Sequence, residues 1–112
     1  MKLPNAELAV VPERKLTHYL LNPAHPDNGG KADFFGKLGF RSSEWETLAA
    51  ALRELARTSP VGLQAESPHG RKYVIVGRIE SRDGKSALVQ TIWMVDTGTD
   101  VARLVTAYPR QE

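Results

Sequence analysis

Two short segments of the sequence hold the side chains best suited to chemistry. The first, NPAHPDNGGKADFF at residues 22–35, contains His25 and Lys31 among prolines and glycines. The second, RLVTAYP, lies near the end of the chain and contains Thr106 and Tyr108. An imidazole titrates near neutral pH and can donate or accept a proton, while ammonium and hydroxyl groups can bind phosphate oxygens.

This set of groups is sufficient for metal-independent cleavage of RNA. The reaction needs a base for the 2′-hydroxyl, an acid for the leaving 5′-oxygen, and donors or cations that stabilise the phosphorane. The predicted catalytic residues are His25, Lys31, Thr106 and Tyr108. His25 would act as general base or acid, which requires the loop over residues 22–30 to fold across the hydroxyl-bearing strand.

Each of these residues also has a plainer explanation. His25 between two prolines fits a surface loop, Thr106 fits strand propensity, and Tyr108 could cap the edge of the core. The two other histidines, His18 and His69, are expected to be structural or exposed.

Motifs for other chemistries are missing from the sequence. There is no glycine-rich phosphate loop after a strand, no G-x-S-x-G and no HExxH. Cysteine is absent, which excludes a thiolate nucleophile, a disulfide framework and a cysteine-bearing zinc site. We therefore expect no metal and no cofactor. The net charge of +2 permits a polyanionic partner without requiring one.

The bulk composition is that of an ordinary globular protein, with 41% hydrophobic and 25% charged residues. A chain of 112 residues suffices for one domain, expected to span residues 1–112. No apolar run is long enough for a signal peptide or a membrane span. The default expectation is a cytoplasmic protein without a membrane partner.

Three helices are predicted in the first half of the chain, within about residues 13–58. The first covers residues 13–21 and stops at an Asn-Pro pair, and the second covers residues 31–39. The third, in SSEWETLAAALRELARTSP, starts with the capping-box pair Ser43 and Glu46 and carries apolar residues at i, i+3, i+4 and i+7.

The second half changes to a period of two, which predicts strands. VGLQAES, KYVIVGRIES, SALVQTIWMVD and VARLVTAYP are separated by the turn sequences PHGR, RDGK and TGTD. The sheet would occupy about residues 61–109. The expected class is α+β, with the N-terminal helices packed on one face of a four-stranded antiparallel meander.

Two-residue turns at Asp83-Gly84 and at Gly98-Thr99 would assign each strand residue to one face of the sheet. In that register one face is apolar and receives the helices. The other face mixes charged, hydroxyl and aromatic groups, namely Val74, Val76, Arg78, Val89, Thr91, Trp93, Leu104, Thr106 and Tyr108. This mixed face is the predicted site, although a two-layer fold also leaves one sheet face solvated.

The first half of the chain resembles an uncharacterised bacterial domain family. The segment LPNAELAVVPERKLTHYLLNPAHPDNGGKADFFGKLGF is similar to the family pattern KLxxYLLNPxHPxGxxKAxFFxxLGF. Members continue with strands, including a late strand that contains Trp. The resemblance covers nearly the whole chain and supports its domain limits, but it brings no established activity.

The end of the chain, WMVDTGTDVARLVTAYP, resembles bacterial toxin nucleases of the barnase–EndoU–colicin–RelE kind. These have helices followed by a four-stranded antiparallel sheet, often ending in RLxTxYP. In EndoU-like ribonucleases a Thr-x-Tyr pair, matched here by Thr106 and Tyr108, acts with two histidines and a lysine. The second histidine has no clear counterpart here. RelE-like members rely more on Arg and Lys, which adds Arg78 and Arg103 as substrate-binding residues.

Two classes of function follow from these observations. The first is a metal-independent endoribonuclease or toxin-like ribonuclease domain, with RNA as substrate and a cognate immunity or antitoxin protein as partner. The alternative is a non-catalytic protein-binding module, such as an immunity or accessory partner in a toxin or prophage system. An inactive descendant of the nuclease fold that still binds RNA is a third possibility.

Overall fold

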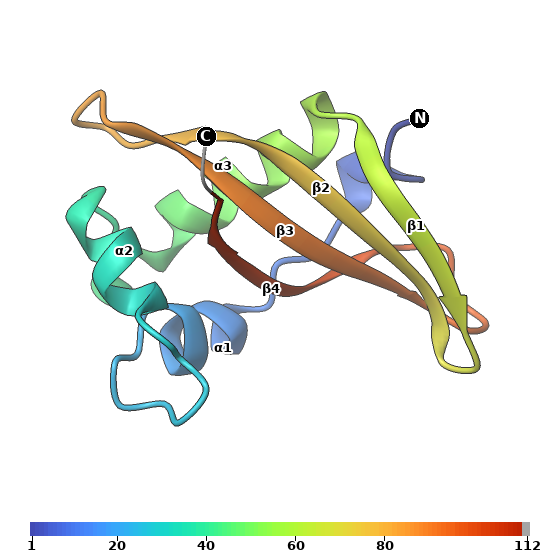
Figure 1. Cartoon of the computed structure of the whole chain (residues 1–112), viewed down its shortest axis with the longest axis horizontal. Coiled ribbons are helices and arrows are strands. Elements are labelled where there is room, and N and C mark those ends of the chain that lie inside the picture. The colour runs from blue at the N-terminus through green and yellow to red at the C-terminus, as the bar shows by residue number, and fades with distance from the viewer. Residues whose placement is uncertain (111–112) are drawn as a thin grey trace.

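The computed structural model describes residues 1–110 of the 112-residue chain (Figure 1). Its helical elements are η1 (Ala6–Leu8), α1 (Glu13–Lys15), η2 (Leu16–Leu20), α2 (Lys31–Lys37), η3 (Ser42–Glu44) and α3 (Trp45–Thr58). Its strands are β1 (Val61–Ser67), β2 (Gly70–Glu80), β3 (Ser86–Asp96) and β4 (Arg103–Pro109).

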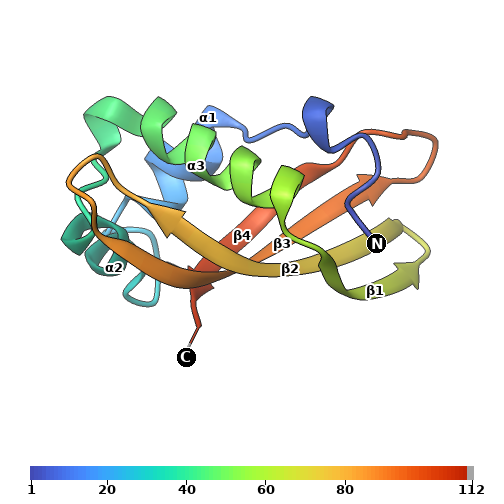
Figure 2. The ribbon, with the colours of Figure 1, turned by 90° about the horizontal axis from the view of Figure 1, so that it is seen from above.

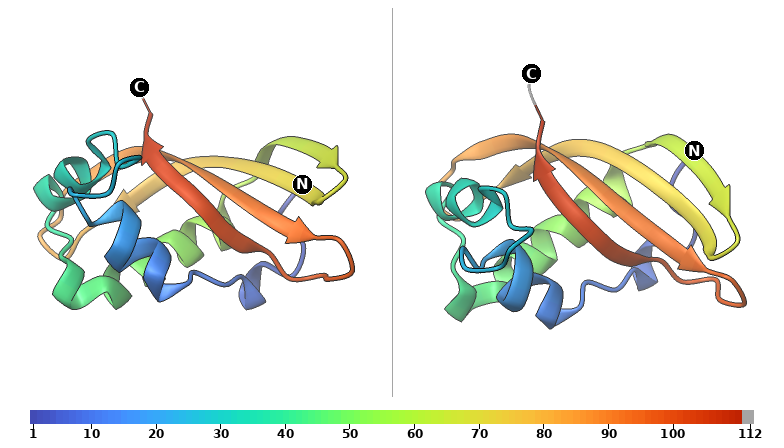
Figure 3. Two further views of the ribbon diagram at one scale, coloured as in Figure 1. Left: turned by 90° about the horizontal axis from the view of Figure 1, so that it is seen from below. Right: turned by 60° about the horizontal axis from the view of Figure 1, so that its bottom comes forward.

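The four strands form an antiparallel sheet in the order β1-β2-β3-β4. Figure 2 shows α3 and the N-terminal segment on one side of this sheet. The helices α1 and α2 both contact β4, and Figure 3 shows them beside that strand. The predicted α+β class, with helices on one face of an antiparallel meander, is confirmed.

The first predicted helix begins as α1 and widens into η2, which is a π-helix. The Leu21 N–H donates to the Leu16 carbonyl oxygen at 2.8 Å, an i→i+5 hydrogen bond. Leu16 and Leu20 are both buried, whereas Tyr19 is half-buried. Single π turns are frequent at functional sites. The widened turn here carries Tyr19 on the side of the helix that meets β4.

The start of α3 differs from the prediction. Ser43 lies in η3, and α3 begins at Trp45 with Glu44 as N-cap and no side-chain capping hydrogen bond. The capping-box prediction is therefore wrong. The apolar face is as predicted, and its buried residues are Leu48, Ala49, Leu52, Leu55 and Ala56.

The core lies between α3, the N-terminal segment and the inner face of the sheet. Its largest fully buried side chains include Trp93, Tyr73 and Phe35. The buried Thr91 hydroxyl donates to the Ile75 carbonyl oxygen and accepts from Trp93 Nε1, both at 2.8 Å. Buried polar groups are costly without partners, so this pair of bonds stabilises a hydroxyl at the centre of the sheet.

The turn between β2 and β3 is one residue longer than predicted. The Ser81 N–H donates to the Lys85 carbonyl oxygen at 2.8 Å, which leaves a three-residue loop over residues 82–84. Gly84, at φ 80°, supplies the left-handed residue that such a loop requires. A one-residue change in register moves every β3 side chain to the opposite face.

The predicted mixed face is therefore wrong for β3. Three β3 residues that were predicted to lie on the outer face are buried in the core, namely Val89, Thr91 and Trp93. Leu104 of β4, predicted on the same face, is also buried. A bulge at Val105, between the pairs Trp93–Leu104 and Ile92–Thr106, then shifts the second half of β4 by one residue. Because the two shifts cancel, Thr106 and Tyr108 still lie on the outer face with Arg78.

The outer face consists of rows of residues paired across the strands. One row joins Leu63, Val74, Ile92 and Thr106. The next row joins Val76, Gln90 and Tyr108. No helix within residues 1–110 is long and apolar enough to cross a membrane.

Candidate functional site

Tyr19 is the residue that brings the two predicted segments together. Its hydroxyl lies 2.9 Å from the Thr106 hydroxyl, so η2 is hydrogen-bonded to β4 across 87 residues of sequence. The Tyr19 ring also contacts His25, with centroids 5.0 Å apart and the planes at 63°. This edge-to-face geometry is favourable for aromatic rings. Tyr19 therefore links the loop that carries His25 to the strand that carries Thr106.

Two lysines approach the same tyrosine. Lys31 Nζ lies 5.4 Å and Lys15 Nζ 5.6 Å from the centroid of the Tyr19 ring, within the range of cation–π attraction. Lys31 Nζ also donates to the carbonyl oxygens of Asp27 and Asn28, at 3.3 and 3.1 Å. In the described part of the chain neither ammonium group has a carboxylate partner. Two positive charges thus remain without a carboxylate partner beside the Tyr19 ring.

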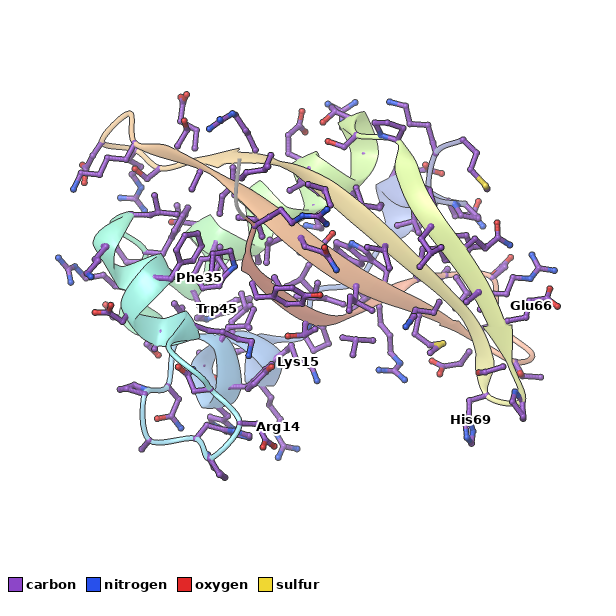
Figure 4. All side chains as sticks on the ribbon, viewed as in Figure 1. Arg14, Lys15, Phe35, Trp45, Glu66 and His69 are labelled. Atoms are coloured by element: carbon purple, nitrogen blue, oxygen red, sulfur yellow. The ribbon has the colours of Figure 1, made fainter. Side chains whose placement is uncertain are left out.

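We call this group the Tyr19 cluster, and its members are Lys15, Tyr19, His25, Lys31 and Thr106. Figure 4 shows how the two neighbouring cations of the first helix differ, because Lys15 lies on the side facing β4 whereas Arg14 extends away from the sheet. Lys15 is accordingly half-buried and Arg14 exposed.

His25 has one ring nitrogen already engaged. Its Nδ1 accepts a hydrogen bond from the Asp27 N–H at 3.0 Å. An acceptor nitrogen carries no proton, so the neutral imidazole in this arrangement holds its proton on Nε2. The Nε2 edge of His25 is therefore a hydrogen-bond donor.

Asn28 fixes the loop against both neighbouring helices. It is 3% exposed, and its Nδ2 donates to the carbonyl oxygens of Tyr19 and Leu20 at 2.6 and 3.3 Å. Its Oδ1 accepts from the Ala32 N–H in the first turn of α2 at 2.9 Å. One amide thus satisfies backbone groups at the end of η2 and at the start of α2. The positions of His25 and Lys31 both depend on it.

Tyr108 lies outside the Tyr19 cluster and belongs to a neighbouring set of contacts. Gln90 Nε2 donates to the Tyr108 hydroxyl, and Gln90 Oε1 accepts from Arg110 Nη1. Tyr108 follows Thr106 by two residues on β4, so both side chains lie on the outer face. Of the four predicted catalytic residues, three therefore share one cluster and the fourth adjoins it.

The two predicted substrate-binding arginines lie in different surroundings. Arg78 is exposed on the outer face, paired across the strands with Leu88. Arg103 lies at the start of β4, and its guanidinium donates to both Asp96 carboxylate oxygens at 2.7 and 3.0 Å. This hydrogen bonding by Arg103 lowers the pKa of Asp96 below its ordinary value. No hydrogen bond or ion pair among residues 1–110 joins Arg103 to Lys15, Tyr19, His25, Lys31 or Thr106.

Sequence reasoning missed Tyr19, Lys15 and Asn28. Tyr19 lies in the first predicted helix, and a partly buried tyrosine needs a partner for its hydroxyl. Lys15 precedes Tyr19 by four residues, the spacing of neighbours on a helix surface. These two signals were present in KLTHYLLN. The role of Asn28 could not be recognised, because it depends on how the loop returns to η2.

A cavity lies at the other end of the molecule. It has a volume of about 440 Å³ between the β1–β2 turn, the β3–β4 turn and the N-terminal segment. Two of the three carboxylate residues that line it, Glu66 and Asp96, are paired with Arg71 and Arg103. Figure 4 shows Glu66 and His69 at this end, far from Lys15. Among residues 1–110, no three His, Asp or Glu side chains gather in a way that could hold a metal ion.

The chain is similar in fold to a solved structure from Klebsiella pneumoniae 342. That structure is described as a contact-dependent growth inhibition toxin–immunity protein complex, and the similarity has a TM-score of 0.75 at 15% sequence identity. It covers 96% of this chain and 97% of that chain. At this level of identity the likeness concerns the fold alone. No curated protein matches the sequence significantly.

A family match extends over nearly the whole sequence. Residues 2–111 match the domain of unknown function DUF6883. The resemblance of the first half of the chain to an uncharacterised domain family thus agrees with a match that also includes the sheet. The chain belongs to the DUF6883 family.

Proposed function

We propose that this protein is a metal-independent endoribonuclease of the toxin type, with the Tyr19 cluster as its active site. The observation that carries the proposal is the convergence of His25, Lys31 and Thr106 on one tyrosine. These three residues come from a loop, a helix start and the last strand. Packing alone does not require an imidazole, two ammonium groups and two hydroxyls to meet at a surface. Together they match the groups that stabilise a phosphorane.

In the proposed reaction the 2′-hydroxyl of RNA gives its proton to water and attacks the adjacent phosphorus, the bond to the 5′-oxygen breaks as that oxygen takes a proton from His25, and a 2′,3′-cyclic phosphate remains. Lys15 and Lys31 bind the phosphate oxygens and stabilise the negative charge that develops on them. The Tyr19 and Thr106 hydroxyls orient the phosphate. Tyr108 positions the nucleotide, and Arg78 contacts the RNA that flanks the cleaved position. Arg103, held by Asp96, is not part of the proposed phosphate site.

His25 acts on the leaving group in this proposal. A general acid is required to protonate the 5′-oxygen, and imidazolium is suited to that role near neutral pH. Imidazolium carries a proton on both ring nitrogens, so this role requires Nδ1 to lose the hydrogen bond from the Asp27 N–H, and the proton is then given from Nε2. Abstraction of a proton through Nε2 would require the same hydrogen bond to be lost.

A second candidate function is that of an immunity or accessory protein. The structure of similar fold is described as a toxin–immunity protein complex, and both members of such a complex belong to a toxin system. An immunity protein would bind its toxin and would cleave no RNA. The two candidates therefore differ in whether the purified chain is itself a nuclease.

The test is cleavage of RNA by the purified protein in the presence of EDTA. We expect the wild type to produce 2′,3′-cyclic phosphate ends, and a single 2′-deoxy substitution at the cleaved position to stop the reaction. Changing His25→Ala should lower the rate about 100-fold or more, since general acid–base catalysis contributes on that scale. The unfolding free energy should change by less than about 1 kcal/mol, as for surface sites.

His69→Ala is the matched control, because His69 is an exposed histidine at the opposite end of the molecule. It should retain the wild-type rate. An inactive wild type, or equal losses in the two histidine variants, would reject the proposed active site. Protection of cells from a toxin by an inactive wild type would establish the immunity function instead.

A further inference from the structure

The outer face continues beyond the Tyr19 cluster to Gln90 and Arg110, which the proposed mechanism does not use. Tyr108 lies two residues after Thr106, and the Arg110 N–H donates to the Leu88 carbonyl oxygen at 3.0 Å. This bond extends the β4 ladder past Pro109, so the backbone of Arg110 is held by the sheet. Successive outward residues on a strand are separated by about 7 Å. That spacing is comparable to the distance between neighbouring phosphates in an extended nucleic acid strand.

Gln90 holds the two polar groups of this second position. A guanidinium can only donate, so the Gln90 atom facing Arg110 must be its oxygen. The amide nitrogen then faces Tyr108 and donates to its hydroxyl. The Tyr108 proton is consequently not used by Gln90 and can be given to a ligand. Four of the five Arg110 N–H groups are likewise not used by Gln90.

The groups offered here are chiefly donors, and one of them is positively charged. In the described residues Arg110 has no carboxylate partner. Half-buried apolar side chains flank the position, namely Val76, Leu88 and Ile92. A donor set with positive charge favours an anionic acceptor, and the apolar surface suits the ribose or base attached to it.

We infer that Gln90, Tyr108 and Arg110 form a second phosphate subsite, one nucleotide away from the phosphate held by the Tyr19 cluster. This inference rests on the proposed function, because it takes RNA as the ligand of the neighbouring cluster. The enzyme then requires two consecutive phosphates for tight binding. A dinucleotide with one phosphate occupies only one of the two subsites.

The experiment measures the dissociation constants of two short RNAs whose 2′-hydroxyls are methylated and which therefore cannot be cleaved. One is a trinucleotide with two phosphates, and the other is a dinucleotide with one. We expect the wild type to bind the trinucleotide about tenfold more tightly, as for one charge-assisted contact. Arg110→Gln and Gln90→Ala should abolish this preference, with thermal unfolding recorded to show that both variants remain folded.

Arg53→Gln is the matched control, because Arg53 is an exposed arginine on α3. It should keep the tenfold preference. The subsite is rejected if the wild type binds both RNAs equally, or if Arg110→Gln retains the preference. If the Arg110-dependent preference is found but the wild type cleaves no RNA, the subsite stands and the nuclease proposal fails. If the wild type cleaves RNA but lacks the preference, the nuclease proposal stands and the subsite is rejected.

Discussion

The positively charged residues near the two ends of β4 differ in whether they have a carboxylate partner. At the start of the strand, Arg103 is bound to Asp96 through two hydrogen bonds. Arg71 and Glu66 form a further ion pair nearby, beside the cavity of about 440 Å³. Next to the second half of the strand, Lys15 and Lys31 face a tyrosine ring and backbone carbonyls instead of carboxylates.

This difference separates structural charges from charges that can bind a ligand. An arginine already neutralised by a carboxylate gains little from a phosphate, because the carboxylate must first be displaced. An ammonium group held by neutral partners keeps its full charge for an incoming anion. The cavity of about 440 Å³ alone would have pointed to the opposite end of the molecule. The Tyr19 cluster is the better candidate because its cations lack anionic partners among the described residues.

The largest expected effect is that of replacing Asn28, whose neutral side-chain amide holds the segment with His25 and Lys31 in place. Asn28→Ala removes hydrogen bonds to Tyr19, Leu20 and Ala32 and leaves buried backbone groups without partners. We expect the unfolding free energy, measured with urea, to fall by about 2–4 kcal/mol. Asn22 begins the same loop and is less buried than Asn28. Asn22→Ala should therefore lower the unfolding free energy by less than about 1 kcal/mol. Equal losses would show that Asn28 does not anchor the loop.

The comparison of paired and unpaired cations can be tested within α2. Lys31 has no carboxylate partner in the described residues, whereas Lys37 forms an ion pair with Asp33 at 3.1 Å. Lys31→Gln should weaken binding of a methylated RNA about tenfold and lower the salt dependence by about one counterion. Lys37→Gln and Arg103→Gln should leave both values near those of the wild type. If all three substitutions weaken binding alike, the distinction between the two ends fails.

The contact between η2 and β4 is expected to have a smaller effect. Tyr19→Phe and Thr106→Val each remove one hydroxyl of a single hydrogen bond. Each should lower the unfolding free energy by about 1 kcal/mol. The double variant should be little worse than either single variant, because the same bond is lost. Fully additive losses in denaturant unfolding would mean that the two hydroxyls do not stabilise one another.

The smallest effect is expected at the paired end of β4. Because the pKa of Asp96 is lowered in the folded protein, its pair with Arg103 stabilises the fold above the ordinary carboxyl pKa. This contribution is lost as the pH falls through the lowered value. The difference in unfolding free energy between the wild type and Asp96→Asn should therefore be constant above about pH 5 and shrink in acid. A difference that grows in acid would contradict the lowered pKa.

Much of the fold could be predicted because its signals are local. The bounds of β1 and β3 coincide with the predicted segments VGLQAES and SALVQTIWMVD. The register in which the strands pair could not be predicted from the sequence. Asp83-Gly84 is compatible with loops of two or three residues, and nothing local distinguishes them. The bulge at Val105 also has no signal in RLVTAYP, because it depends on how β4 meets β3.

The candidate site was partly predictable for the same reason. The residue types His25, Lys31 and Thr106 could be selected by their chemistry, and the cancelling register shifts preserved the outward direction of Thr106. The contact that joins them could not be foreseen. It depends on the π turn that orients Tyr19 and on Asn28, whose hydrogen bonds follow from the path of the loop.

The long sequence separation of the Tyr19–Thr106 hydrogen bond has a consequence for biosynthesis. Contacts between residues far apart in the chain form late, because the intervening segment must be ordered first. A nascent chain that has not yet extended through β4 contains the imidazole and both ammonium groups but lacks the Thr106 hydroxyl. The complete Tyr19 cluster can therefore form only after translation has passed residue 106.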